Sequence, residues 1–318
     1  MPSRSQKEPD MKIAVIGAGF VGSTTAQRLV EGNLGDVVLY DIVEGLPQGK
    51  ALDMMESAPI LGFESRVVGT NDPKDLSGSA LVVVTSGIAR QPGMSRDDLL
   101  ERNAGIVASV ADHLLEHASQ AIMIVVTNPV DILTHLMAVK VGTPKERILG
   151  MGGILDSGRF RHFIAMELGV AQADVDAMVL GGHGDDMVPL PRFATVNGVS
   201  IEALLSQEQI QKLVARTRDG GAEIVRHLKK GSAYYAPSAA IAQMVESIVR
   251  DQKRLLPCSA WCSGQYGITG QFVGVPVILG RAGVEKIVEL PLSVAEEKDL
   301  HTSSAHVASK IAQLQIAG

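Results

Sequence analysis

The chain is poor in aromatic residues and in basic charge, and both shortages exclude classes of protein. Aromatic residues make up 3% of the 318 residues and hydrophobic residues 46%, so the core must be aliphatic. Acidic residues outnumber basic ones by 35 to 29, which gives a formal net charge of −6. A nucleic-acid surface needs a basic patch, so no nucleic-acid partner is expected. No run of about 18 apolar residues occurs, which argues against a membrane partner or a membrane-spanning helix.

Cysteine is nearly absent, since the chain contains only Cys258 and Cys262. The two residues suit neither a disulfide framework nor a zinc site, because such a site needs about four ligands. We expect two reduced, mostly buried thiols and no metal site. A cytoplasmic location follows by default.

The length of the chain indicates about two domains. Residues 1–10 are polar, contain prolines and lack the apolar segment of a secretory signal. They predict a disordered extension ahead of the folded part.

A glycine motif lies between an expected strand and an expected helix. The aliphatic run Lys12–Ile16 leads into Gly17-Ala18-Gly19-Phe20-Val21-Gly22, and residues 23–30 have helical character. In such a motif, Gly17 permits a tight turn, Gly19 lets a pyrophosphate approach the backbone, and Gly22 lets helix and strand pack closely. The helix N-terminus adds free N–H groups and a positive dipole end. The alternative is a purely structural glycine turn.

The next expected strand, Asp36–Tyr40, ends in Asp41, nineteen positions after Gly22. A carboxylate there can accept both ribose hydroxyls of NAD and would repel the 2′-phosphate of NADP. The pair of features therefore predicts an NAD site.

Strands and helices alternate over the first half of the chain, which predicts right-handed βαβ units and a doubly wound parallel sheet of the Rossmann type. Further strands are expected at 66–69, 80–85, 121–127 and 147–149, and helices at 48–57, 103–117 and 130–139.

Polar residues follow two of these strands, as Thr85-Ser86-Gly87 and Thr127-Asn128-Pro129. Ligands of open α/β sheets bind beyond the carboxyl ends of the strands. Residues 87–98 contain Pro92 and Gly93 and predict a long loop or lid at this edge. The loop carries Arg90 and Arg96, which either are solvated or bind a carboxylate with their guanidinium forks.

The second half contains a candidate acid–base residue. The apolar run 177–180 ends in Gly181-Gly182-His183-Gly184-Asp185, and imidazole titrates near neutral pH. Asp156 and Arg159 lie three apart on an expected helix from 154 to about 168, where they can form a plain ion pair. Alternatively, Asp156 orients His183 while Arg159 binds a substrate carboxylate.

The remaining pattern is mixed α+β. A hairpin turn is expected at Asn197-Gly198. Helices are expected at 201–230, 239–250 and 293–314, with strands and glycine turns over 256–290. We predict a dinucleotide-binding domain over residues 11–154 and a substrate domain over residues 155–318.

From Lys12 to its end the chain resembles the lactate/malate dehydrogenase superfamily, and it looks most like bacterial malate dehydrogenases of the lactate-dehydrogenase type. The resemblance is carried by residues 17–22, Asp41, Arg90 to Arg96, Thr127-Asn128-Pro129, Leu155-Asp156-Ser157-Gly158-Arg159 and Gly181-Gly182-His183-Gly184-Asp185. One departure is Gly158, where many relatives have alanine, and it should loosen the helix by roughly 0.5–1 kcal/mol.

The resemblance implies reversible hydride transfer between malate and NAD, in the tricarboxylic acid cycle, by a homodimer or homotetramer. It implies that His183 is the proton acceptor and donor, that Asp156 is its partner, and that Arg96 polarises the reacting carbonyl. It further implies that Arg159 and Asn128 bind substrate, and that NAD contacts Asn103, Val126, Thr127 and Asn128 in addition to the glycine loop and Asp41.

Arg90 separates the two activities of the family. The resemblance implies that malate enzymes have arginine at this position and lactate enzymes have glutamine. Because an unpaired buried anion costs several kcal/mol, a dicarboxylate needs this cation, whereas pyruvate would leave Arg90 unpaired. The alternatives are a lactate dehydrogenase and, on the same fold, a non-catalytic NAD-binding regulator.

Overall fold

The computed structural model describes residues 11–89 and 94–314. Its first half contains β1 (Lys12–Ile16), α1 (Phe20–Glu31), β2 (Asp36–Tyr40), α2 (Leu46–Leu61), β3 (Val67–Thr70), β4 (Leu81–Val84), α3 (Arg96–His117), β5 (Ile122–Val125), α4 (Val130–Val141) and β6 (Ile148–Gly150). Its second half contains α5 (Gly153–Leu168), β7 (Val175–Asp176), β8 (Val179–Gly181), β9 (Met187–Pro189), β10 (Thr195–Val196), β11 (Val199–Ser200), α6 (Ile201–Leu204), α7 (Gln207–Leu228), α8 (Tyr235–Val249), β12 (Arg254–Ser263), β13 (Thr269–Gly280), β14 (Gly283–Ile287) and α9 (Val294–Gln313). The expected extension, residues 1–10, lies outside the described residues.

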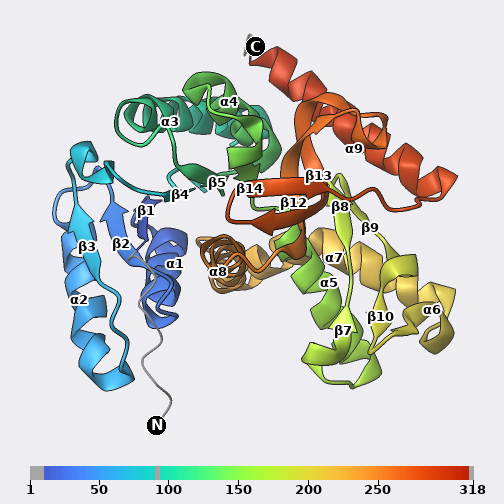
Figure 1. Ribbon diagram of the computed structural model, residues 1–318. Coiled ribbons are helices and arrows are strands. Elements are labelled where there is room, and N and C mark those ends of the chain that lie inside the picture. The colour runs from blue at the N-terminus through green and yellow to red at the C-terminus, as the bar shows by residue number, and fades with distance from the viewer. Residues whose placement is uncertain (1–10, 90–93, 315–318) are drawn as a thin grey trace.

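The strands of the first half form the predicted doubly wound sheet, in the order β3-β2-β1-β4-β5-β6, with every neighbouring pair parallel. The sheet continues into the second half, because β12 pairs antiparallel with β6 and is followed by β13 and β14. A single nine-stranded sheet therefore crosses both halves (Figure 1). Its antiparallel extension is not indicated by the sequence pattern.

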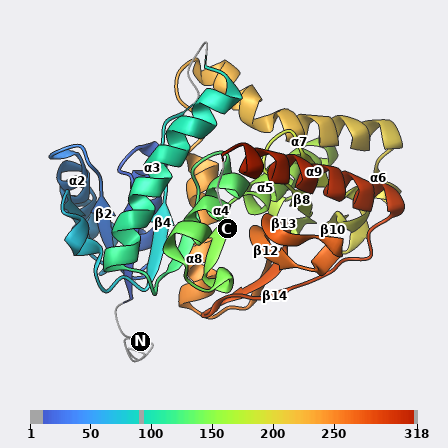
Figure 2. The ribbon, with the colours of Figure 1, turned by 90° about the horizontal axis from the view of Figure 1, so that it is seen from above.

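Each strand of the parallel part is apolar on both sides because helices cover both faces. In β4, Leu81 and Val83 pack into one cluster while Val82 and Val84 pack into another. The helices α3 and α4 cover one face, and α1 and α8 lie side by side against the other (Figure 1). Figure 2 looks onto the face that carries α3 and α4, with α9 farther along the molecule.

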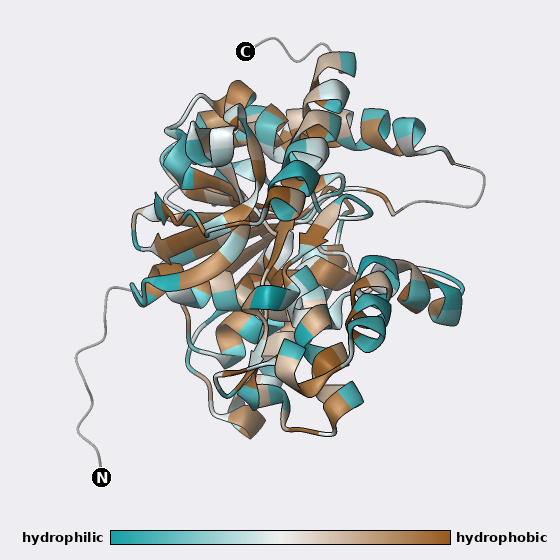
Figure 3. Ribbon diagram, turned by 90° about the vertical axis from the view of Figure 1, so that its right-hand side faces the viewer, coloured by the Kyte–Doolittle hydropathy of each residue, from teal (hydrophilic) through white to brown (hydrophobic). Residues whose placement is uncertain are grey.

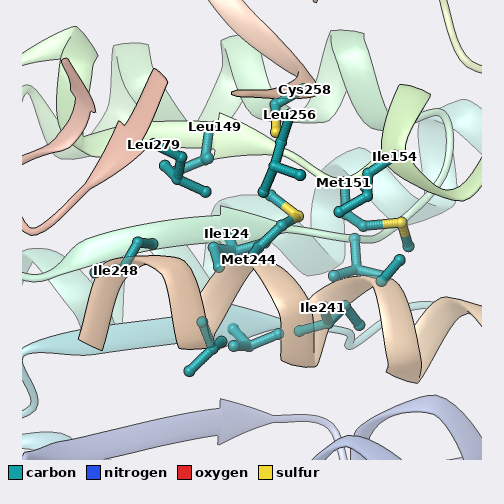
Figure 4. Packing of buried hydrophobic residues seen from close by; sticks show 14 of the residues in the cluster. Ile124, Leu149, Met151, Ile154, Ile241, Met244, Ile248, Leu256, Cys258 and Leu279 are labelled. Atoms are coloured by element: carbon teal, nitrogen blue, oxygen red, sulfur yellow. The ribbon is translucent and has the colours of Figure 1, made fainter. Parts of the chain in front are cut away.

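Helix α8 comes from the second half but completes the core of the first. Its residues Ile241, Met244 and Ile248 pack with Ile124 and Leu149 of the parallel sheet (Figure 4). This shared core fixes the two halves to each other. Outward faces of the helices carry hydrophilic stripes, whereas the interior strands are mainly hydrophobic (Figure 3).

Several expected boundaries are wrong. Residues 96–98 are not loop, because Ser95 and Asp98 form a capping box that starts α3 at Arg96. The long helix over 201–230 is interrupted, since Ser206 caps a new helix, α7. Helix α8 begins at Tyr235, because Pro237 is tolerated in its first turn. Helix α2 is longer than expected at both ends, from Leu46 to Leu61.

Both cysteines are free and buried in β12, as expected. Burial raises the pKa of each thiol to about 12, so neither is a reactive thiolate. Within residues 11–89 and 94–314, none of the helices combines the length and the apolarity needed to cross a bilayer.

Candidate active site

The glycine loop, Asp41, residues 85–87 and residues 126–128 follow the carboxyl ends of β1, β2, β4 and β5, which are neighbours in the sheet. Side chains tie these strand ends together. The Thr85 hydroxyl donates to the carbonyl of Gly17 at 3.1 Å, and the Thr127 hydroxyl donates to the carbonyl of Ser86 at 2.6 Å. The edge is therefore one connected surface.

The glycine loop has the geometry that a dinucleotide needs. Gly17 has φ of +101°, and a Cβ at Gly22 would lie 1.8 Å from the Gly17 carbonyl oxygen, so neither position accepts a side chain. A Cβ at Gly19, in contrast, would meet nothing within 4 Å. Gly19 is also the N-cap of α1, and its side-chain-free backbone leaves open space at the helix N-terminus. These residues fit a pyrophosphate group.

Asp41 is tied to the same loop. Its Oδ2 accepts from the Ala18 amide at 2.6 Å, and its Oδ1 accepts from the Val43 amide at 2.9 Å. A carboxylate offers about four lone-pair sites, so both oxygens can still accept from ribose hydroxyls. Lys50 braces the loop by donating to the Ala18 carbonyl at 2.6 Å.

Asn103 lies in α3, 1% exposed, and its amide is used within the protein. Its Oδ1 accepts from the Ile88 amide at 2.8 Å, and its Nδ2 donates to the Asn128 carbonyl at 2.8 Å. The side chain thus connects α3, the loop after β4 and the loop after β5. Asn128 itself is exposed, whereas Val126 and Thr127 are buried.

The second half brings His183, Asp156 and Arg159 together. His183 follows β8, and its Nδ1 lies 2.7 Å from Asp156 Oδ2. The other Asp156 oxygen accepts from Arg159 Nη1 at 3.1 Å, so one carboxylate forms the ion pair and contacts the imidazole as well. The side chains are 14%, 1% and 12% exposed, respectively.

Two opposing effects set the protonation of His183. Burial lowers the pKa of the imidazole, but the charge and hydrogen bond of Asp156 raise it, and the net direction is upward. Asp131 adds to the rise, and Arg159 opposes it. A histidine held at Nδ1 by a carboxylate can exchange a proton through Nε2.

Two arginines were expected on the loop after β4. Arg90 lies outside the described residues. The backbone of Arg96 forms the first residue of α3, seven positions before Asn103.

Several neighbours of the site were not predicted. Asp131 accepts from the His183 backbone amide at 2.9 Å. A Cβ at Gly220 of α7 would lie 3.1 Å from Arg159 Cδ, so α7 approaches Arg159 closely. The adjacent glycines 220 and 221 inside a helical pattern signal such an approach. Tyr234 stacks on Phe20 of the glycine loop with ring centroids 5.2 Å apart, a contact with no local signal.

Family models and relatives agree with this geometry. The model of the lactate/malate dehydrogenase NAD binding domain matches residues 11–150, and that of the alpha/beta C-terminal domain matches residues 154–315. A malate dehydrogenase of Chloroherpeton thalassium is 54% identical over 298 residues, covering 93% of this chain and 96% of the relative.

Two solved structures extend the comparison. Malate dehydrogenase from Picrophilus torridus has a TM-score of 0.93 at 47% identity, covering 95% of this chain and 96% of the other. Lactate dehydrogenase from Cryptosporidium parvum, solved with lactic acid and nicotinamide adenine dinucleotide, has a TM-score of 0.94 at 44% identity, covering 98% of this chain and 100% of the other.

Proposed function

The chain belongs to the lactate/malate dehydrogenase family and is an NAD-dependent oxidoreductase, and we propose that it interconverts malate and oxaloacetate with His183 as general base and acid. The observation that carries the proposal is the 2.7 Å contact between His183 Nδ1 and Asp156. It orients the imidazole so that Nε2 is the nitrogen that exchanges a proton with substrate.

In malate oxidation, neutral His183 removes the proton of the substrate hydroxyl, and the Asp156 carboxylate stabilises the imidazolium that forms. In the reverse direction, the imidazolium donates this proton to the carbonyl oxygen. General acid–base catalysis of this kind contributes about 10²–10⁴-fold to the rate. When bound, NAD supplies the hydride acceptor for oxidation and NADH the donor for reduction.

The arginines bind and polarise the acid. Arg159 pairs with the carboxylate next to the reacting carbon, since a guanidinium fork matches a carboxylate. Arg96 supports negative charge on the carbonyl oxygen during reduction, and Asn128 donates to substrate. Arg90 pairs with the distal carboxylate of the dicarboxylate.

The edge of the sheet would hold NAD. The glycine loop from Gly17 to Gly22 would bind the pyrophosphate, and Asp41 would bind the ribose hydroxyls. Val126, Thr127 and Asn128 would contact the cofactor. Asn103 would support these contacts by holding the main chain at Ile88 and Asn128.

A steady-state assay of NADH oxidation tests the proposal, with oxaloacetate set beside pyruvate. We expect a higher kcat/KM with oxaloacetate, and His183→Asn should lose about 10²–10⁴-fold of kcat while keeping NADH binding. His162→Asn, an exposed histidine on α5, is the control and should keep full activity. Full turnover by His183→Asn would refute the assigned role.

Lactate dehydrogenase is the second candidate, because solved lactate dehydrogenases are also similar to this chain. The Arg90→Gln variant separates the two, since it should move the ratio of kcat/KM values toward pyruvate. Unchanged selectivity for oxaloacetate would show that Arg90 does not bind the distal carboxylate of the substrate.

We propose that the enzyme works in the cytoplasm, in the tricarboxylic acid cycle, as a homodimer or homotetramer. Two free, buried thiols agree with a reducing compartment. We also propose a division near residue 154 between the dinucleotide-binding and substrate domains. Analytical ultracentrifugation of the purified chain tests the oligomeric state.

A further inference from the structure

The main chain around His183 is held by side chains from two helices. Ser303 of α9 accepts from the Gly182 amide at 2.7 Å, and Asp131 of α4 accepts from the His183 amide at 2.9 Å. The imidazole is held separately by Asp156 of α5. The consecutive amides of Gly182 and His183 are therefore held by one segment that precedes them in the sequence and by one that follows them.

Asp131 is a buried group with every oxygen in use. It is 5% exposed, its Oδ2 binds the His183 amide, and its Oδ1 accepts from the Ser259 hydroxyl at 2.6 Å. Ser259 lies in β12, opposite Gly150 of β6, where the two parts of the sheet join. The carboxylate thus connects the His183 turn to the junction between β6 and β12.

Asp131 is also close in sequence to a proposed substrate ligand. Asn128 lies three residues earlier, just before Pro129, which is the N-cap of α4. A short segment of backbone thus carries the Asn128 amide and the carboxylate that binds the His183 amide. Building on the function proposed above, we propose that Asp131 is a positioning residue, which fixes the main chain of His183 and thereby sets the imidazole against Asn128.

The charge of Asp131 gives the role a measurable signature. Among the residues that the structure describes, the charged groups that act on His183 are Asp156 and Arg159 from α5 and Asp131 from α4. Asp131 raises the pKa of the imidazole. Loss of this carboxylate should therefore lower the pKa of His183, which loss of a merely structural contact would not do.

Three variants test the inference. Asp131→Ala removes both hydrogen bonds and the charge, and should lose about 100-fold in kcat/KM, the cost of a misplacement near 1 Å. Asp131→Asn keeps an acceptor for the His183 amide, and its amide group can donate to the Ser259 oxygen in place of accepting from it, so it should restore activity to within about tenfold of the wild type at its own optimum. Thr134→Val, one turn farther along α4, is the control, since its buried hydroxyl bonds only the Val130 carbonyl among the described residues.

The pKa of His183 is measured in each apoenzyme by NMR, with the signal identified by its absence in His183→Asn. We expect a lower pKa in Asp131→Asn and an unchanged one in Thr134→Val. Wild-type activity in Asp131→Ala would overturn the inference, as would equal losses in Asp131→Ala and Thr134→Val or an unshifted pKa in Asp131→Asn. An inactive wild type with the expected NMR shifts would instead refute the proposed reaction alone.

Discussion

The Asp156 carboxylate divides its two oxygens between the two groups proposed to act on substrate. One oxygen holds His183 and the other holds Arg159, in a position that is 1% exposed. Because a buried carboxylate must be paired, the triplet is fixed as a unit. The residue proposed to transfer the proton and the residue proposed to bind the carboxylate are thereby held by the same side chain.

Replacement of Asp156 by asparagine should change the pH profile of the reaction. Asp156 raises the pKa of His183, so Asp156→Asn should lower it. Oxaloacetate reduction needs the imidazolium, and its rate falls as pH rises through this pKa. In the variant, that fall should begin at a lower pH.

The measurement is kcat/KM for oxaloacetate from pH 5 to 10. Malate oxidation needs neutral imidazole, so its rise with pH should also move to lower pH in the variant. A shift of the two limbs in opposite directions would contradict assignment to one titrating histidine.

Residue types and spacing led to His183, Asp156 and Arg159, but not to Asp131. Asp156 and Arg159 are three apart on one helix, and glycines surround His183, so both signals are local. Asp131 contacts His183 across 52 positions of sequence. Such a contact depends on how α4 packs against the turn after β8, and no local pattern encodes it.

The glycines Gly158 of α5 and Gly220 of α7 differ in the space around them. Gly158 of α5 is exposed and a Cβ there would meet nothing within 4 Å, whereas a Cβ at Gly220 of α7 would lie 3.1 Å from Arg159 Cδ. Gly158 therefore costs helix stability without a structural gain. Gly220 leaves room for the guanidinium arm.

The pair Gly158→Ala and Gly220→Ala tests this difference. Gly158→Ala should stabilise the protein by about 0.5–1 kcal/mol in urea unfolding, with an unchanged KM for oxaloacetate. Gly220→Ala should raise KM by displacing Arg159 by a few tenths of an ångström, an effect smaller than the roughly 100-fold loss from a 1 Å misplacement. A raised KM in Gly158→Ala, together with an unchanged KM in Gly220→Ala, would contradict the role assigned to Gly220.

The type of an element was predictable where its hydrophobic periodicity ran over many residues. The predicted boundary was wrong where a capping box sets the start of a helix. The helix over 201–230 reads as continuous, but Ser206 and Gln209 form a capping box that starts α7. Ser95 does the same for α3 and draws residues 96–98 out of the expected loop. In both places a pair of reciprocal hydrogen bonds between side chain and backbone outweighs the average propensity of the surrounding residues.

One continuous sheet and one shared core run through the whole molecule. Alternating strands and helices predicted the six parallel strands, because those units are local. The pairing of β12 with β6 and the insertion of α8 beside α1 join distant segments, so they were not predicted. His135 lies at this junction, since its ring on α4 approaches Trp261 of β12 and Phe272 of β13 at 5.8 Å and 6.3 Å.

Global stability should therefore fall in mild acid through His135. Burial, and then the charge of Lys145, lowers the pKa of His135 in the folded state below its ordinary value of 6.5. Below about pH 6.5 the unfolded chain binds a proton that the folded chain does not, so the free energy of unfolding decreases as pH falls. Nδ1 has no hydrogen-bond partner among the described residues, so none of them stabilises a proton on that nitrogen by a hydrogen bond.

His135→Leu isolates this contribution, since leucine does not titrate and any packing offset is the same at every pH. In urea unfolding followed by circular dichroism, the free energy of unfolding of the wild type should drop more between pH 8 and pH 5.5 than that of the variant. Any contribution of the other histidines is common to both proteins and cancels in the comparison. A wild-type minus variant difference that stays constant over this range would show that His135 binds its proton equally in the folded and the unfolded protein, which would contradict the prediction.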